Sequence, residues 1–368
     1  MKRRVEVEID LKALKRNYEK IAAKVKPCEV LCVLKANAYG LGVKEYAKVL
    51  GRNFGVAEPF EALELKKAVP GARVQILSSI LPDEIEDMVA AEVVLPVIDI
   101  KTAKLIDAAA KKQGKKAKMQ FKLDTGMGRL GILAKDAIAT MKEVRKLENL
   151  EIEGVFSHCP MAYDPEDPFT GEQIKRFKAI VEQAKAEEFK FRYVHIAASD
   201  AINNFPEAYK APFNLVRTGI NLHGSFDPNG QKSLKVEPVL TLKTRVAQVR
   251  ELEPGTTLGY GRTWCLNRKT KVATISAGYA DGLPLALTNR GHVLIKGKVC
   301  PVIGRISMDY TTVDASGVKD LKPGDEVICL GRSGRYSVTP DDWAALKGTH
   351  AYDIICSLGS RVERKVKR

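Results

Sequence analysis

The sequence lacks the features of several classes of protein. None of its seven cysteines forms a CxxC pair, so no zinc or disulfide framework is indicated and reduced thiols in a cytoplasmic protein fit best. No stretch approaches the roughly 18 uninterrupted apolar residues of a membrane span. The opening MKRRVEVEID is basic but has no apolar segment of a secretion signal. We therefore expect a cytoplasmic protein that has no metal site and no membrane partner.

Acidic residues are fewer than basic ones, which raises the question of a nucleic-acid partner. The net charge is +15, and such an excess is typical of proteins that bind nucleic acid. However, the basic residues are scattered over helix-like segments such as KALKRNYEK and AAAKKQGKKAK, with no recognised binding motif. Attraction of small anions, or solubility alone, explains the excess equally well. We expect no nucleic-acid partner.

The first two thirds of the chain alternate between strand-like and helix-like patterns. Asp10 is a candidate helix N-cap, because apolar residues follow it at helical spacing from Leu11 to Val25. Eight apolar runs with intervening amphipathic stretches predict a parallel sheet closed into an α/β, (β/α)₈ TIM-like barrel. The predicted strands are 30–35, 54–57, 73–78, 93–98, 118–123, 152–157, 192–197 and 214–222.

The pattern changes after SFDPNGQKS. Short segments of period two follow, such as KVATISAGY, and turn signals such as EPGT and KPGD separate them. With 368 residues, two domains are expected. We predict a barrel domain over 10–230 and a C-terminal β-rich domain over 231–368, to which the alternating residues 1–9 pair.

Residues able to do chemistry follow the predicted strands, at the end where barrel enzymes have their active sites. Lys35 ends the first strand in CEVLCVLKANAYGLG, a run otherwise typical of a strand buried on both faces. By composition alone, a solvated lysine at a strand end is the simpler interpretation. The later strands add further candidates, which converge on the same face of the barrel. These are Arg129 in KLDTGMGRLG, His158 in FSHCP, His195 and Ser199 in HIAAS, and Arg217, Gly219 and Ile220 in LVRTGINLHG.

The segment GMGRLG also matches the GxGxxG fingerprint of dinucleotide-binding proteins, with Glu151 about twenty residues beyond. That fingerprint belongs in the first turn of an open sheet, whereas this one follows the fifth of eight predicted strands. A glycine-rich turn that presents Arg129 is the better interpretation. An NAD-dependent oxidoreductase is a weak alternative.

Seven motifs in order resemble those of the bacterial alanine racemases. These enzymes bind pyridoxal 5′-phosphate (PLP) in an eight-stranded barrel that precedes a β domain. The resemblance spans about residues 5–365. The motifs are VEIDLKALKRN, VLKANAYGLG, KLDTGMGRLG, GVFSHCP, LVRTGINLHG, SAGYADG and GRISMDY.

The resemblance implies a role for each candidate around the cofactor. Lys35 matches the lysine that binds PLP as a Schiff base, and we expect cationic neighbours and little water around its amine. Arg217 matches the residue that faces the pyridine nitrogen, and His158 one that packs beside the ring, although a satisfied core histidine is the alternative. The positions that match the phosphate-binding residues are Tyr39, Ser199, Gly219 and Ile220.

The resemblance also implies a two-base interconversion of L-alanine and D-alanine, which supplies D-alanine for peptidoglycan. Lys35 matches one base and Tyr279 the other. In the family, that tyrosine and the Met308 region come from the partner subunit, so a homodimer with shared active sites is expected. Arg129 matches the residue that holds the substrate carboxylate. Lys122 matches a lysine that can be carbamylated, and an ordinary Lys122 paired with Asp124 is the alternative.

Three positions depart from the family pattern. Ala198 stands where an asparagine often precedes the serine, and Ser307 replaces a cysteine. Ser360 stands where some relatives carry a phosphate-binding tyrosine. Three rival functions remain besides the oxidoreductase: a PLP decarboxylase, a racemase for serine or a broader range of amino acids, and a non-enzymatic PLP carrier. The combination of Arg129 with Tyr279 argues against the decarboxylase. Carriers resemble the barrel alone, so the SAGYADG-bearing segment argues against the last.

Overall fold

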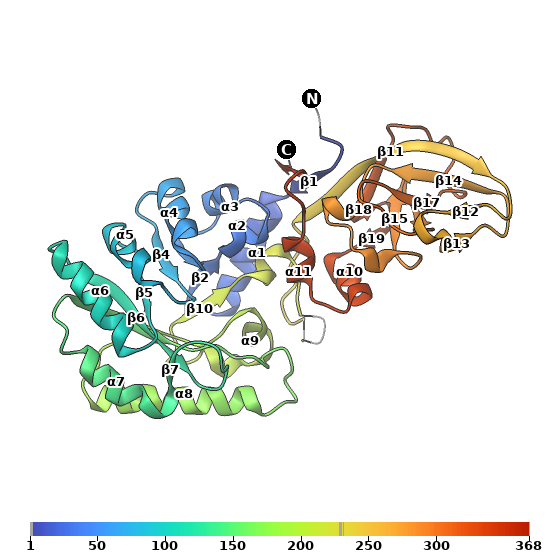
Figure 1. Cartoon of the computed structure of the whole chain (residues 1–368). Helices are drawn as coiled ribbons and strands as arrows, with labels where there is room; N and C mark the ends of the chain where they lie inside the picture. The colour runs from blue at the N-terminus through green and yellow to red at the C-terminus, as the bar shows by residue number, and fades with distance from the viewer. Residues whose placement is uncertain (1–2, 228–229, 231, 368) are drawn as a thin grey trace.

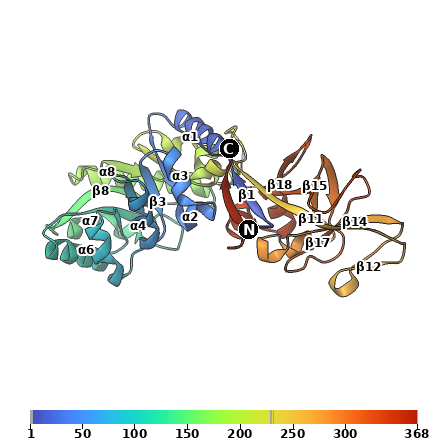
Figure 2. The ribbon, with the colours of Figure 1, turned by 90° about the horizontal axis from the view of Figure 1, so that it is seen from above.

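The chain folds into two lobes, which a computed structural model describes for residues 3–227, 230 and 232–367. The blue-to-green barrel lies apart from the orange β-rich lobe, and β1 lies at the junction (Figures 1 and 2). The fold is α/β, with a β-rich C-terminal part. None of the described helices combines the length and the apolar character needed to cross a membrane.

The barrel is built from eight parallel strands in chain order. Its hydrogen-bonded neighbours run β10-β2-β3-β4 and β5-β6-β8-β9. A parallel bridge between Gln75 and Val94 joins β4 to β5, and the Asn214 amide donates to the Val194 carbonyl (3.1 Å), which brings β9 to β10. The predicted barrel is confirmed. The strands are β2 (Glu29–Val33), β3 (Asn53–Val56), β4 (Arg73–Ile76), β5 (Leu95–Val97), β6 (Ala117–Asp124), β8 (Leu150–Phe156), β9 (Tyr193–His195) and β10 (Leu215–Thr218).

Helices pack around the outside of these strands, as the amphipathic stretches predict. The Asp10 side chain accepts from the Ala13 amide (2.9 Å) at the start of the first helix, so this predicted N-cap is confirmed. The helices are α1 (Leu11–Lys24), α2 (Lys35–Tyr39), α3 (Val43–Val49), α4 (Pro59–Ala68), α5 (Ile85–Ala90), α6 (Ile100–Lys112), α7 (Ala137–Val144), α8 (Phe169–Ala186) and α9 (Ser199–Asn204). A short strand β7 (Ile132–Leu133) pairs with β6.

The β-rich lobe is centred on one long strand, β11 (Leu240–Leu252), which pairs with β1, β14 and β18. β1 (Glu6–Ile9) lies between β11 and β20 (Glu363–Val366), antiparallel to the former and parallel to the latter. The first and last described strands of the chain therefore lie side by side in this lobe. Its other elements are β12 (Thr257–Leu258), β13 (Trp264–Cys265), β14 (Thr270–Ile275), β15 (His292–Ile295), β16 (Lys298–Pro301), β17 (Thr311–Asp314), β18 (Glu326–Ser333), β19 (Tyr336–Val338), α10 (Pro340–Lys347) and α11 (Ala351–Cys356).

The C-terminal segment returns from the β-rich lobe to the barrel. α11 packs against α2, and the Arg364 side chain donates to the Gly40 carbonyl (2.9 Å). The mouth of the first barrel strand is thus covered in part by residues more than 300 positions away.

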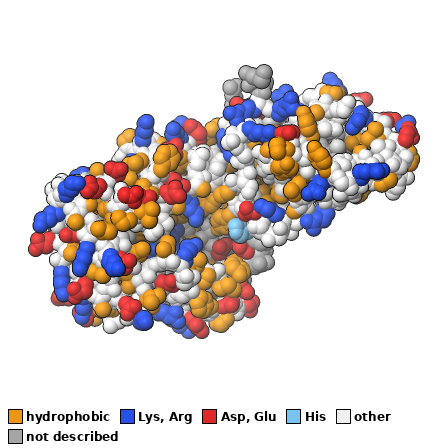
Figure 3. Space-filling model, in the orientation of Figure 1, with side chains coloured by type: hydrophobic (Ala, Val, Ile, Leu, Met, Phe, Trp, Pro, Cys, Tyr) orange, Lys and Arg blue, Asp and Glu red, His pale blue; other side chains and the backbone are white. Residues whose placement is uncertain are grey.

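On one face of the molecule (Figure 3), the described residues form no continuous basic stripe. On the face shown in Figure 3, Lys and Arg side chains are interspersed with acidic and apolar ones. Surface pairs such as Lys112 with Glu86 (2.8 Å) and Lys146 with Glu143 (2.6 Å) contribute to this mixture.

Candidate active site

Lys35 stands at the mouth of β2, where the backbone takes an uncommon path. Ala36, Asn37, Ala38 and Tyr39 all have positive φ, between 53° and 58°, so one turn of left-handed helix follows the lysine. Such a conformation costs L-residues about 1–2 kcal/mol each. Strain of this kind is found where function requires a particular geometry.

Local hydrogen bonds hold this turn. The Asn37 side-chain oxygen accepts from the Val43 amide (2.8 Å), which is the first amide of α3. The Glu61 carboxylate accepts from the amides of Ala36 and Ala57. The Lys35 side chain itself is exposed, so the expectation of a desolvated amine is wrong for the isolated chain, although the expected cationic neighbours are present.

A cradle of hydroxyl and amide groups lies beside this turn. The Gly219 amide, at the end of β10, donates to the Ser199 hydroxyl (3.1 Å). A side chain at Gly219 would place its Cβ 2.1 Å from the Tyr39 hydroxyl oxygen, so these two residues are in close contact. Ile220 is fully buried and begins the short helix η4 (Ile220–His223). The structure therefore brings all four predicted phosphate-binding residues together.

A fifth member of the cradle comes from α11 and was missed by the sequence analysis. The Tyr352 ring centroid lies 5.7 Å from that of Tyr39, and its hydroxyl interacts with Ser199. Burial raises the pKa of Tyr352 well above its ordinary value, so the hydroxyl keeps its proton. The placement of Ser360 at this position is wrong, because Ser360 is exposed and its carbonyl accepts from Arg3 (2.9 Å).

Arg217 is the most heavily bonded of the predicted residues. It is 4% exposed and donates to the carbonyls of Ser157 (2.7 Å) and Ile196 (2.9 Å). It also contacts the ring nitrogens of His195 (2.7 Å) and His158 (3.4 Å). Burial lowers the pKa of Arg217 to about 10, which leaves the guanidinium charged at neutral pH.

Both histidines beside Arg217 are held neutral. Burial, followed by the charges of Arg217 and Arg129, lowers the pKa of His158 to about 3. Burial and Arg217 also take the pKa of His195 well below its ordinary value. A neutral imidazole beside a guanidinium can accept a hydrogen bond from it.

Lys122 is a second amine of the cluster, at the end of β6. It is 5% exposed and donates to the carbonyls of Leu77 (2.5 Å) and Ser78 (3.2 Å). Burial and then the charges of Arg129, Arg217 and Lys35 lower the pKa of Lys122 to about 8. The alternative of a Lys122–Asp124 pair is wrong, because the Asp124 carboxylate accepts from the amides of Gly126 (2.8 Å) and Gly128 (3.2 Å) instead.

Arg129 lies exposed in the turn that these bonds organise. Gly126, Gly128 and Gly131 all have positive φ, which explains the glycines without a nucleotide. Glu151 lies at the start of β8, next to Lys118 of β6 and so at the opposite end of the strands. One bound dinucleotide would not contact both the glycine-rich turn and Glu151, because they lie at opposite ends of the strands. The oxidoreductase interpretation therefore loses its support.

Tyr279 and Met308 lie together in the β-rich lobe. The Tyr279 amide donates to the Ser307 carbonyl and the Ala280 amide to that of Met308 (both 3.1 Å). The Arg361 guanidinium links the two loops through salt bridges to Asp281 and Asp309 (2.8 Å each). The sequence patterns did not predict this residue. Tyr279 is 44% exposed and Met308 51%. Among the described residues, no hydrogen bond links Tyr279 to Lys35 or Arg217.

Two protein-family models match the chain, one on each side of the junction between the two lobes. Residues 9–227 match the alanine racemase N-terminal domain, and residues 239–366 match the alanine racemase C-terminal domain. The chain belongs to the alanine racemase family. It is therefore an enzyme, an isomerase that acts on amino acids.

Individual alanine racemases are similar over almost the whole length. The alanine racemase of Halothermothrix orenii is 34% identical, with 98% of this chain and 96% of the relative covered. Alanine racemase 2 of Caldanaerobacter subterraneus subsp. tengcongensis is 36% identical, with 97% and 93% covered.

Solved structures of the family have the same fold. The crystal structure of the Streptomyces lavendulae alanine racemase gives a TM-score of 0.92 at 31% identity and covers 100% of this chain and 98% of the other. That of the Bartonella henselae alanine racemase, with covalently bound pyridoxal phosphate, gives 0.87 at 30% identity and covers 98% of both chains.

Proposed function

We propose that this enzyme interconverts L-alanine and D-alanine with PLP and two bases, and that its D-alanine supplies peptidoglycan. The observation that carries the proposal is the cluster at the barrel mouth. There, an exposed amine, Lys35, lies among cationic side chains and beside a cradle of hydroxyl and amide donors, in a chain of the alanine racemase family.

The donor set fits the cofactor. A phosphate group is bound well by hydroxyls and backbone amides, and the approach of Tyr39 to Gly219 leaves no room for a side chain there. Lys35 would bind the aldehyde covalently, Arg217 would face the pyridine nitrogen, and His158 would pack beside the ring. When bound, PLP supplies an electron sink for the negative charge that develops on the substrate α-carbon.

Two bases are needed because the proton must leave one face of the α-carbon and arrive at the other. Lys35 would serve one face and Tyr279 of the partner subunit the other. The exposure of Tyr279 and Met308, together with Tyr310 (39% exposed), supports a role for this lobe at a subunit interface. We therefore propose a homodimer whose active sites are shared between subunits.

The remaining cations suit an amino-acid substrate. Arg129 is exposed at the barrel mouth and would hold the substrate carboxylate. Lys122, whose pKa is about 8, has a substantial neutral fraction at the pH of the cell. A neutral amine is the form that reacts with carbon dioxide, so Lys122 can be carbamylated and the resulting anion would orient Arg129.

Borohydride reduction of the PLP-loaded enzyme, followed by peptide mass spectrometry, tests the position of the cofactor. We expect the pyridoxyl group on Lys35. A group on Lys122 or on another lysine would contradict the assignment.

Isotope exchange tests the two bases. Tyr279→Phe should retain PLP and stop racemisation, while it still exchanges the α-hydrogen of one alanine enantiomer in deuterated water. Tyr336→Phe, which changes a tyrosine of β19, is the matched control and should racemise normally. Equal exchange of both enantiomers by the Tyr279 variant would contradict the assignment. Activity regained on mixing inactive Lys35→Ala and Tyr279→Phe chains would support the shared site.

A further inference from the structure

A continuous line of buried polar side chains runs through the interior of the barrel below Arg217. The His195 ring nitrogen Nε2 lies 2.8 Å from the Gln120 side-chain oxygen, which also accepts from the Gln75 amide (2.9 Å). The Gln120 amide donates to the Glu153 carboxylate (3.1 Å). His195, Gln120 and Gln75 are 0% exposed and Glu153 is 5% exposed.

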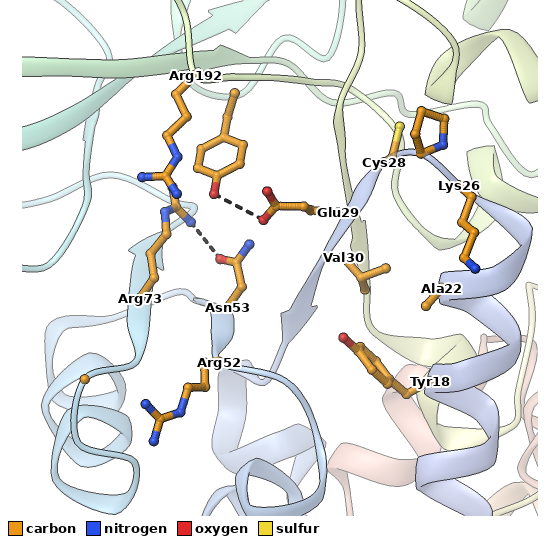
Figure 4. A pocket seen from close by; sticks show the side chains of 13 residues that line it. Tyr18, Ala22, Lys26, Cys28, Glu29, Val30, Arg52, Asn53, Arg73 and Arg192 are labelled. Atoms are coloured by element: carbon orange, nitrogen blue, oxygen red, sulfur yellow. Dashed lines mark hydrogen bonds between the residues drawn. The ribbon is translucent and has the colours of Figure 1, made fainter.

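The line ends at the opposite mouth of the barrel. The Arg73 guanidinium binds the Glu153 carboxylate through two nitrogens and also donates to the side-chain oxygens of Gln75 (3.2 Å) and Asn53 (2.8 Å). Figure 4 shows Arg73 and Asn53 at the edge of a pocket at this mouth. One polar network therefore connects a solvent-facing pocket to the guanidinium at the catalytic mouth.

The two ends determine the direction of every hydrogen bond between them. A guanidinium only donates, so His195 Nδ1, at 2.7 Å from Arg217, must accept and the ring proton must be on Nε2. That proton requires an acceptor, which is the Gln120 oxygen. At the other end an ionised carboxylate only accepts, so the Gln120 amide nitrogen must point to Glu153.

We propose that Gln120, oriented by Glu153 and Arg73, is a positioning residue that sets the tautomer of His195 and thereby the place of Arg217. Without an acceptor at Nε2, the ring can move its proton to Nδ1. That tautomer would place an N–H group against the N–H of Arg217, and the guanidinium would have to shift. The inference rests on the proposed role of Arg217 toward the pyridine nitrogen.

The first test is a measurement on the unchanged protein. The chain has five histidines, so ¹⁵N-histidine NMR is tractable, and a His195→Asn variant assigns the signals. We expect His195 to show an unprotonated Nδ1 and a protonated Nε2 from pH 6 to pH 9, with and without PLP. A protonated Nδ1, or a ring that titrates in this range, would overturn the proposal. This result does not depend on which amino acid the enzyme racemises.

The second test compares two glutamines. Gln120→Met removes the acceptor for His195. Gln75→Met makes the same change at an equally buried neighbour that bonds Gln120 and Arg73 but not the histidine, and it leaves the bond from Gln120 to Glu153 in place. In Gln120→Met we expect a Nδ1-protonated fraction of His195, a shifted absorption spectrum of bound PLP, and a kcat lower by about tenfold to a hundredfold with little change in KM. Gln75→Met should leave the tautomer and the spectrum unchanged.

Gln120→Glu provides the conservative rescue, and it remains informative if Gln120→Met does not fold. Two carboxyl groups at this distance share a proton, so the new carboxyl group, when protonated, can donate to Glu153 in place of the amide while its other oxygen still accepts from His195. We expect this variant to keep the native tautomer and most of kcat. Loss of the Nε2 proton in Gln120→Glu, or a native tautomer in a folded Gln120→Met, would refute the positioning role. If the tautomer changes as expected but alanine is not racemised even by the parent enzyme, the proposed function fails and the positioning inference stands.

Discussion

A single methyl group at Gly219 should disrupt the phosphate cradle. Gly219 has φ −130°, outside the left-handed region, so the absence of space rather than the backbone conformation requires glycine. An added Cβ would lie 2.1 Å from the Tyr39 hydroxyl oxygen and 3.0 Å from the ring carbon that carries it. Ordinary contacts between such atoms are about 3.5 Å or longer, so Tyr39 would have to move by more than an ångström.

Tyr39 has little freedom to move. It is 4% exposed, and its ring packs edge-on against His223 (centroids 4.7 Å apart) and near Tyr352 (5.7 Å). We therefore expect Gly219→Ala to lower the free energy of unfolding by about 1–3 kcal/mol, the usual cost of overpacking. If the Tyr39 hydroxyl then loses its bond to the phosphate, binding loses a further ~1.5–3 kcal/mol, or roughly tenfold to a hundredfold in affinity.

Titration of the apoenzyme with PLP and with pyridoxal separates the phosphate contribution, because pyridoxal has no phosphate. Gly219→Ala should reduce the ratio of the two affinities by about tenfold or more, while the affinity for pyridoxal changes little. Gly171→Ala is the matched control, since a Cβ at Gly171 in α8 meets nothing within 4 Å. In the Tyr39→Phe background, adding Gly219→Ala should reduce the ratio no further.

An unchanged affinity ratio in Gly219→Ala would refute the reasoning, as would an additive effect of the two substitutions. An unchanged ratio would mean that the phosphate group is held elsewhere. An additive effect would mean that the substitution acts on another ligand of the phosphate, such as the Gly219 amide, and not through the Tyr39 hydroxyl.

Three further predictions concern Lys122, Ala198 and Arg361. The pKa of the unmodified Lys122 amine is about 8 in the folded chain against an ordinary 10.5, so the unfolded chain binds more protons between these values and the free energy of unfolding should rise with pH across that window. Urea unfolding in buffer free of carbon dioxide, which keeps Lys122 as the amine, should show this rise in the parent and a smaller one in Lys122→Met, and parallel curves would contradict it. Ala198 is the N-cap of α9 and provides no side-chain cap, so Ala198→Asn should raise the free energy of unfolding by about 1 kcal/mol, whereas an unchanged or lower value would show that the asparagine does not cap. Arg361→Met should lower the free energy of unfolding by about 1–2 kcal/mol, which is less than for a fully buried ion pair because Arg361 is half exposed. It should also reduce kcat without loss of PLP. The control variant Arg335→Met, on the surface, should change neither the free energy of unfolding nor kcat.

Much of the fold could be predicted from local patterns. The eight barrel strands and the helices between them each bury an apolar face, and that face leaves a period in the sequence that does not depend on distant residues. The change to period two near residue 231 predicted the β-rich part in the same way. Because parallel strands present their carboxyl ends at one mouth of a barrel, the order of the strands also predicted that Lys35, His158, Ser199 and Arg217 would gather there.

Local sequence patterns did not predict the backbone conformation or the burial of a residue where these depend on other parts of the fold. The left-handed turn at Ala36–Tyr39 contains no glycine, and it is held by Glu61 and Asn37 rather than by its own preferences. The exposure of Lys35 could not be read from the apolar run before it. Gln75, Gln120 and Glu153 appeared only as single polar residues within apolar strands, and their connection through the barrel required the register of three strands.

The contributions of the C-terminal segment were decided by tertiary structure alone. Tyr352 reaches the cradle, and Arg364 reaches Gly40, because β20 pairs with β1 and carries α11 back to the barrel. Arg361 joins two loops for the same reason. These contacts link residues some 50 to 320 positions apart, and the periodicity of a short sequence window cannot reveal such pairings. Local sequence determined which elements form, and packing between distant elements determined which side chains complete the site.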